Sequence, residues 1–342
     1  MVFLVITINK KVKEVHNCQP GDIPEFVLSS SQPLILKGFA DKWPVVIAGK
    51  ESPQNAAQYL RDFYSDIPIN VYYSEPENKG RVFYNEEMTG FNFVSSKANL
   101  NQVLDKLLVH ADDPKPPTMY IGSTEINQWF PRFKEENNAS IDHLKPLTTI
   151  WIGNRSKIAA HYDFPNNLAC CAVGRRKFTL FPPEQISNLY VGPMEFSPGG
   201  QDISLVDFDE PDLIKHPKFE QALAAAQVAQ LEAGDALFMP SMWWHHVESL
   251  DALGVLVTHW WRDSPAFMGR PNSALMLAML SLRDLPLAQR QAWKAHFDYY
   301  IFDHDEENFE HIADVAKGVL SKPHDELAAR KLRAELFNKL KQ

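Results

Sequence analysis

The sequence has few cysteines, no excess of positive charge and no long apolar run, and each shortage excludes a class of protein. Its 342 residues include three cysteines, Cys18, Cys170 and Cys171, an odd number that builds no disulfide framework and suits a reducing compartment. The formal net charge of -9 disfavours binding to nucleic-acid phosphates. The longest later apolar stretch, residues 273–282, is about half of the ~20 residues that a membrane span needs.

The amino terminus and the composition point to a cytoplasmic globular protein. Residues 1–8 are apolar but lack a basic leader and a cleavage site, so they predict a first strand rather than a signal peptide. Hydrophobic residues make up 45% of the chain, enough for a sizeable core. We therefore expect a soluble cytoplasmic protein with no membrane span. Twelve histidines and eight tryptophans raise the question of where these residues cluster.

The first third of the chain mixes strand-like and helical runs. Residues 33–39 read as a buried strand that ends at a glycine turn, and residues 54–64 and 100–109 have the apolar spacing of helices. Residues 112–117 contain three prolines, which remove backbone donors and indicate a loop. These patterns predict mixed α/β elements before the main body of the protein.

Short β-runs separated by turns dominate residues 118–261, which favours an all-β barrel or sandwich. Within this region we expect one buried and one outward cysteine at positions 170 and 171, and a solvated loop at the acidic residues 207–212. Apolar residues then recur every four positions, as in a helix. The sequence thus predicts a domain at 1–262 and a helical appendage at 263–342 that packs on the barrel, on a second copy or on both, which favours a homodimer.

The motif His-x-Asp occurs three times, beginning at His110, His161 and His296, so the motif alone does not identify a site. In a strand, residues i and i+2 face the same side, whereas on a helix they lie about 200° apart. His110 and His296 fall in helical runs, and only the pair His161 and Asp163 falls in the β-rich region. We therefore expect His161 and Asp163 to bind one metal ion together.

A third ligand is expected from a distant strand. Residues 234–240 form a glycine turn, an apolar strand and a proline, and they lead to the adjacent His245 and His246. Neighbouring residues in a strand face opposite sides, so alternation alone does not say which histidine joins the metal. Two histidines and one carboxylate leave three coordination positions open, which suits Fe(II) oxygen chemistry better than a closed zinc site.

The sequence around these residues resembles a known family. His161-Tyr162-Asp163, Asn167, residues 174–183 and residues 234–249 look like the cupin-like, JmjC-type branch of the Fe(II)/2-oxoglutarate-dependent oxygenases, with a strong likeness to its asparaginyl protein hydroxylases. The similarity runs from about residue 33 to residue 261. It implies a mainly β fold, the double-stranded β-helix or cupin/JmjC jelly roll, with N-terminal mixed elements and the helical appendage. It also implies a hydroxylase that acts on a side chain of a protein.

The resemblance assigns the metal ligands and the co-substrate contacts. Aligned on the tryptophan pair at 243–244, the distal Fe(II) ligand falls on His245, beside the first two ligands. Arg176 stands where the family has a cation for the distal carboxylate of 2-oxoglutarate, with Lys177 as the alternative. Tyr120 and Asn167 match further co-substrate contacts of the family.

Two positions depart from the family pattern. Ile158 replaces a threonine and Thr258 replaces an asparagine, and both changes remove polar contacts to the co-substrate. They favour two alternatives: a metal-dependent cupin that is not an oxygenase and acts on a small molecule, or a degenerate JmjC fold that serves as a binding module. The complete ligand set argues against the module. A protein or peptide substrate is favoured, a small molecule is second, and nucleic acid is disfavoured by the charge.

Overall fold

The computed structural model describes residues 8–320 and 325–341, and the chain divides into two compact units, residues 1–262 and 263–342. Residues 1–7 of the strand expected at the amino terminus lie outside the described residues. Within the described part of the chain, no helix has the length and apolar character needed to cross a bilayer.

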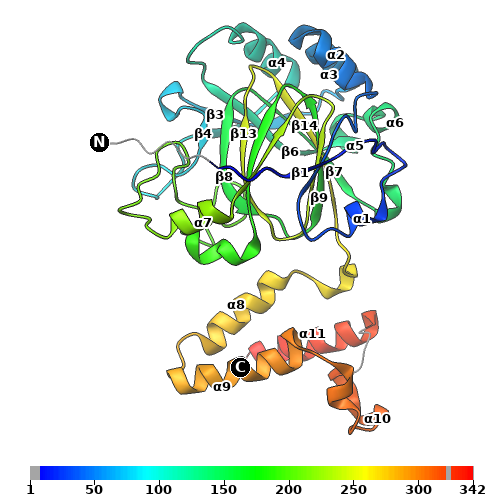
Figure 1. The fold of residues 1–342 in the computed structure, drawn as a ribbon, viewed down its shortest axis with the longest axis vertical. Coiled ribbons are helices and arrows are strands. Elements are labelled where there is room, and N and C mark those ends of the chain that lie inside the picture. The colour runs from blue at the N-terminus through cyan, green and yellow to red at the C-terminus, as the bar shows by residue number, and fades with distance from the viewer. Residues whose placement is uncertain (1–7, 321–324, 342) are drawn as a thin grey trace. The chain divides into compact units, whose positions relative to one another are not determined.

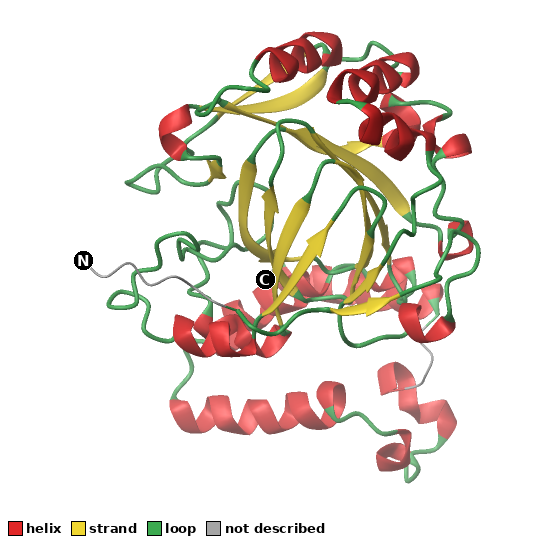
Figure 2. Cartoon of the chain, turned by 45° about the horizontal axis from the view of Figure 1, so that its top comes forward, coloured by secondary structure: helices red, strands yellow, loops and turns green. Residues whose placement is uncertain are grey.

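The first unit is built on two β-sheets that curve into a barrel (Figure 1, Figure 2). In spatial order, the larger sheet contains β1 (Lys13–Val15), β2 (Leu34–Leu36), β12 (Ala236–Met239), β9 (Asn166–Val173), β14 (Gly254–Trp261), β7 (Leu147–Gly153), β6 (Thr118–Glu125), β3 (Ile69–Ser74) and β5 (Val94–Ala98). The smaller sheet contains β11 (Gln227–Leu231), β10 (Arg176–Phe181), β13 (Trp244–Ser249), β8 (Ser156–Tyr162) and β4 (Arg81–Val82). From β7 to β14 the chain crosses repeatedly between the sheets, and this jelly roll confirms the predicted fold class.

Helices cover the outer face of the larger sheet. The helices of this unit are α1 (Glu25–Leu28), α2 (Pro44–Glu51), α3 (Pro53–Phe63), α4 (Leu100–Val109), α5 (Ile126–Trp129), α6 (Phe133–Glu136) and α7 (Phe219–Ala225). The group α2, α3 and α4 packs together on one side of the barrel (Figure 1). Both helices that the sequence predicted in this unit at 54–64 and 100–109 are confirmed, and residues 112–117 form the expected loop.

Strand β9 is buried on both of its faces. Cys170 packs in the core beneath the helices, whereas Cys171 packs inside the barrel with Phe178 and Leu180. The two cysteines alternate faces as expected, but the prediction of an outward cysteine is wrong, because the helices cover the outer face of this strand. Burial raises the pKa of both thiols, which keeps them protonated and inert.

In its described residues, the second unit contains helices joined by loops and no strand. Its helices are α8 (Pro271–Leu282), α9 (Leu287–Phe297), α10 (Asp314–Lys317) and α11 (Glu326–Leu340). Helix α11 matches the four-residue apolar repeat at its end of the chain. Ile312, Val315 and Val319 also have helical spacing but do not share one helix, because Gly318 adopts a φ of 54°, a left-handed conformation that ends α10 after four residues.

The buried imidazole of His259 makes the stability of the fold depend on pH. Its Nδ1 lies 3.2 Å from the carbonyl oxygen of Leu168, and burial lowers its pKa to about 4. The unfolded chain takes up this proton below about pH 6.5, whereas the folded chain takes it up only below about pH 4. Acidification through this window therefore favours unfolding, by at most about 1.4 kcal/mol per pH unit from this group.

Chemical unfolding at pH 7 and at pH 5 tests this dependence. A His259→Gln variant keeps a donor near Leu168 but takes up no proton, so it should lose less unfolding free energy on acidification than the wild type. A His16→Gln variant, whose side chain is 65% exposed, serves as the control and should follow the wild type. The same pH dependence in the wild type and in His259→Gln would contradict the account.

Candidate metal centre and co-substrate cavity

The two strands that carry the predicted ligands, β8 and β13, are hydrogen-bonded neighbours. His161 pairs with His245 in the antiparallel register, and their ring centroids lie 4.2 Å apart. Asp163 follows the end of β8, and its Oδ2 lies 3.7 Å from Nε2 of His245. One candidate ligand atom from each of the three residues lies within 4.8 Å of the other two. The structure thus brings together the three residues that the sequence predicted as ligands.

Backbone hydrogen bonds orient both imidazoles. Nδ1 of His161 donates to the carbonyl oxygen of Ala159 at 2.9 Å, and Nδ1 of His245 donates to that of Trp243 at 3.0 Å. Because Nδ1 carries the proton in each ring, Nε2 keeps a lone pair for a metal. Burial, and to a smaller extent the neighbouring His161, lowers the pKa of His245 to about 4, so this ring is neutral at physiological pH. The donor set fits Fe(II).

The adjacent histidine faces the other side of β13. The ring of His246 stacks on Phe208, with centroids 4.5 Å apart and an angle of 19° between the ring planes. Of the two histidines that alternation left open, His245 is therefore the one that faces His161 and Asp163. Among the residues that the structure describes, no other three His, Cys, Asp or Glu side chains come close enough together to hold a metal ion.

A cavity of about 320 Å³ inside the barrel contains the three ligands. Its size falls at the lower end of the range for small-molecule sites, about 300–1,000 Å³. Four of the five predicted co-substrate residues and the departure at position 158 line the same cavity: Tyr120, Asn167, Arg176, Thr258 and Ile158. Lys177 is the fifth, and it does not line the cavity.

Arg176 and Lys177 begin β10 and point to opposite sides of it. Arg176 is only 3% exposed, and no carboxylate of the described residues lies within ion-pair distance of its guanidinium. Lys177 instead forms an ion pair with Glu248 at 2.8 Å on the other face. Burial lowers the pKa of Arg176, yet a guanidinium stays protonated in proteins. A buried, unpaired cation is costly unless an anion joins it, so Arg176 is the cation suited to a ligand carboxylate.

Tyr120 reaches the cavity because two strands approach closely there. It pairs with Gly153 in the register of β6 and β7, and a Cβ at Gly153 would lie only 2.5 Å from the carbonyl oxygen of Met119. Glycine therefore permits this close approach. Burial raises the pKa of the Tyr120 phenol, and it remains a hydrogen-bond donor. Oδ1 of Asn167 is also buried, and it accepts no hydrogen bond from any described residue.

The two departures from the family pattern differ in what they do. The hydroxyl of Thr258 accepts a hydrogen bond from the indole of Trp151 at 2.9 Å and shares one with Thr149 at 2.8 Å. Thr258 thus holds one aromatic wall of the cavity in place. Ile158 adds an apolar surface to the cavity and no polar contact. Both departures change the polarity of the cavity wall but leave Arg176 and the three ligands in place.

Two parts of the site were missed from the sequence. The first is an aromatic row, in which Tyr72, Trp151 and Trp260 join the predicted Tyr120, one side chain from each of four neighbouring strands. Strand alternation around these residues could have predicted this row. The second is Gln201, whose Nε2 donates to Oδ1 of Asp163 at 3.2 Å. Gln201 follows Gly199 and Gly200 in an irregular segment, and no motif marks it.

Comparison with known proteins identifies relatives that span part of this architecture. Lysine-specific demethylase JMJ31 of Arabidopsis thaliana is 37% identical over 123 residues, which cover 35% of this chain and 22% of that protein. JmjC domain-containing protein D of Dictyostelium discoideum is 23% identical over 273 residues, 72% of this chain and 56% of that protein. tRNA wybutosine-synthesizing protein 5 of Gallus gallus is 36% identical over 106 residues, 31% of this chain and 30% of that protein.

The family assignment comes from a longer match. The chain covers less than two thirds of the length of each of these three relatives. The family model described as a cupin-like domain, by contrast, matches residues 20–267. That range contains both sheets of the jelly roll except β1, and it contains the three candidate ligands and the whole cavity lining. The chain belongs to the cupin-like domain family and is related to its JmjC-domain proteins.

Proposed function

We propose that this protein is an Fe(II)- and 2-oxoglutarate-dependent oxygenase that hydroxylates a side chain of a protein substrate. The observation that carries the proposal is one cavity that contains both a converging set of metal ligands and a buried, unpaired guanidinium. A co-substrate that chelates a metal through one end and carries a carboxylate at the other needs both features. The buried Arg176 therefore favours 2-oxoglutarate chemistry over other cupin chemistries.

Each residue of the site has a defined part in this proposal. His161, Asp163 and His245 would hold Fe(II) and leave three positions open. Arg176 would pair with the distal carboxylate of 2-oxoglutarate, and Tyr120 would donate a hydrogen bond to it. When bound, Fe(II) and 2-oxoglutarate supply the oxidising chemistry, in which one oxygen atom of O₂ enters a substrate C–H bond and the other enters succinate as CO₂ leaves.

The other residues that line the cavity would orient the bound groups and exclude water. The aromatic row gives the cavity an apolar wall, and Thr258 fixes Trp151 within that wall through its hydroxyl. Asn167 presents a buried carbonyl oxygen that a bound water or ligand group can satisfy. A dry, shaped site strengthens the attraction between Arg176 and a ligand carboxylate, because the local dielectric constant is low.

A protein or peptide is the favoured substrate class. One relative is named as a lysine-specific demethylase, which supports a protein substrate. Another relative is named for tRNA, but the net charge of -9 makes a nucleic-acid substrate less favoured for this chain. Among the described residues, Asp163 is the one acidic side chain that lines the cavity. The cavity therefore favours an uncharged substrate side chain over a cationic one. A small-molecule substrate is the alternative, because the cavity is small.

Turnover of 2-oxoglutarate tests the proposed activity. The protein supplied with Fe(II), 2-oxoglutarate and O₂ should produce succinate slowly even without its substrate, and more in the presence of that substrate. Asp163→Ala should reduce succinate to the level of the protein-free control, because the carboxylate ligand is lost. The matched variant Asp62→Ala, on the exposed side of α3, should behave like the wild type. A wild type that yields no succinate would refute the activity.

We also propose that the cytoplasm is the site of action. All three cysteines are unpaired and buried, so the fold makes no use of disulfide bonds. A protein that keeps its thiols reduced suits a reducing compartment.

The C-terminal unit carries an apolar surface that we propose is covered by a second copy of the chain. Helix α8 is apolar around its circumference, and it contains no buried residue. Leu275, Met276 and Leu280 on this helix are 48%, 55% and 79% exposed. A helix that is hydrophobic all round is normally buried, which supports a partner surface for α8.

A charge placed on α8 should separate the two copies. We expect the wild type to elute as a dimer in size-exclusion chromatography and Leu280→Glu to elute as a monomer, because a carboxylate in an apolar interface loses its hydration. Ile214→Glu is the matched control, since Ile214 is 97% exposed in the first unit, and it should remain dimeric. A monomeric wild type would contradict the proposal.

A further inference from the structure

The segment before α7 runs beside the ligand strand β8. Ile203 forms an antiparallel bridge with His161, and the amide of Ser204 donates to the carbonyl oxygen of Ala160 at 2.7 Å. In an antiparallel register, the residue two positions before Ile203 faces the residue two positions after His161. Gln201 therefore lies opposite Asp163, and its Nε2 donates to Oδ1 of that carboxylate at 3.2 Å.

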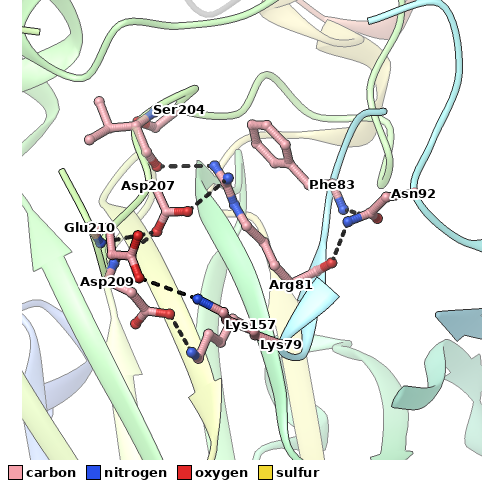
Figure 3. A network of polar contacts seen from close by, with 10 residues as sticks. Lys79, Arg81, Phe83, Asn92, Lys157, Ser204, Asp207, Asp209 and Glu210 are labelled. Carbon is pink, nitrogen blue, oxygen red and sulfur yellow. Dashed lines mark hydrogen bonds and ion pairs between the residues drawn. The ribbon is translucent and has the colours of Figure 1, made fainter. Parts of the chain in front are cut away.

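This segment is anchored on both sides of Gln201. Before it, the hydroxyl of Tyr84 donates to the carbonyl oxygen of Phe196. After it, three ion pairs fasten the acidic stretch to β8, to β4 and to the turn before β4 (Figure 3): Lys157–Asp209, Arg81–Asp207 and Lys79–Glu210. The prediction of a solvated loop at residues 207–212 is confirmed, since residues 209, 210 and 212 are exposed and no helix or strand forms there. The sequence did not predict that basic residues distant in the chain pair with its carboxylates. Each exposed pair is weak, but together they fix the position of the segment.

The two oxygens of Asp163 consequently have different neighbours. Oδ2 lies 3.7 Å from Nε2 of His245, whereas Oδ1 accepts a hydrogen bond from the side-chain amide of Gln201. The last torsion of an aspartate is broad and roughly two-fold, so an unrestrained carboxylate rotates and can present both oxygens to a metal. A second bound oxygen would fill a coordination position that the co-substrate or O₂ needs.

We infer that Gln201 is a positioning residue for Asp163, which holds Oδ1 by a hydrogen bond so that Oδ2 alone binds the metal. The inference rests on the metal site of the proposed function, and it assigns a role to a segment outside the barrel strands. Outer hydrogen-bond partners of metal ligands typically change metal affinity by about 10- to 100-fold when they are removed. Gln201 is the one described residue whose side chain donates to this carboxylate oxygen.

Titration of the metal-free protein with Co(II) tests the inference. Gln201→Met keeps the length of the side chain but removes the donor, and Gln201→Ala removes both. We expect both variants to bind Co(II) about 10-fold more weakly than the wild type. The ligand-field spectrum of their Co(II) complexes should shift toward higher coordination. Gln221→Met, at an exposed position of α7, is the matched control and should bind as the wild type does.

The possible outcomes separate this inference from the proposed function. If Gln201→Met binds Co(II) with the affinity and spectrum of the wild type, the inference is overturned while the metal site stands. If only Gln201→Ala is affected, packing rather than the hydrogen bond matters, and the inference is again overturned. If the wild type binds no Co(II), the metal site and the inference fall together. Unchanged melting temperatures of the metal-free variants would show that their fold is intact.

Discussion

A His161→Ala variant is expected to lose its Fe(II) site, with metal affinity reduced by at least about 100-fold. Removal of a hydrogen-bond partner of a metal ligand typically weakens metal binding by about 10- to 100-fold. This substitution removes one of the three ligands themselves, so its effect should be at least as large. The ring of His161 is oriented by the Ala159 carbonyl and faces His245, and no other described histidine is placed to substitute for it. Equilibrium titration of the metal-free protein with Fe(II) under anaerobic conditions measures the change.

The control for this variant is another histidine of the same sequence motif. His110 begins a His-x-Asp motif at the end of α4, where its Nδ1 lies 3.2 Å from Asp113 rather than near the barrel cavity. His110→Ala should therefore bind Fe(II) as the wild type does. If His161→Ala kept wild-type affinity, the assignment of the ligands would be wrong, and a comparable loss in His110→Ala would mean that the binding is nonspecific.

An Arg176→Ala variant is expected to need far more 2-oxoglutarate while it still binds Fe(II). The buried guanidinium is the one cation among the described lining residues, so its loss leaves a ligand carboxylate without a counter-charge. Truncation of one partner in a buried charge pair costs about 2–5 kcal/mol, which corresponds to a rise of at least about 30-fold in the concentration required. Binding of 2-oxoglutarate to the Fe(II) protein, followed anaerobically, gives this value.

The neighbouring lysine provides the matched control for Arg176. Lys177 pairs with Glu248 at a half-exposed position, and such ion pairs contribute about 0–1 kcal/mol to stability. Lys177→Ala should therefore leave the affinity for 2-oxoglutarate unchanged. If Lys177→Ala weakened binding and Arg176→Ala did not, the choice between these two cations would have to be reversed.

The sequence predicted the barrel and its ligands because their determinants are local. Residues spaced i, i+2, as His161 and Asp163 are, share a face of a strand but lie on opposite sides of a helix. The β-rich surroundings therefore distinguish this motif from the other two His-x-Asp motifs. The choice of His245 over His246 could not come from alternation, which only says that the two face opposite sides. The resemblance to the family selected His245, and the structure places that histidine beside His161.

The features that the sequence did not predict depend on which distant segments pack together. Whether a cysteine on β9 is exposed depends on helices that cover the sheet from elsewhere in the chain, so the burial of both Cys170 and Cys171 was not predicted. The ion pairs of the acidic loop were not predicted, because Arg81, the partner of Asp207, lies 126 residues earlier. Gln201 lies beside Asp163 because Ile203 forms an isolated bridge with His161 outside the regular strands. No local sequence pattern predicts such a contact.

The central claim is that one cavity binds Fe(II) and 2-oxoglutarate together. Anaerobic reconstitution of the wild-type protein with Fe(II), followed by addition of 2-oxoglutarate, tests it most directly. Chelation of the metal by the co-substrate produces a visible metal-to-ligand charge-transfer band, and we predict this band in the wild type and its absence in His161→Ala. A wild-type protein that binds Fe(II) but shows no band at saturating 2-oxoglutarate would contradict the account.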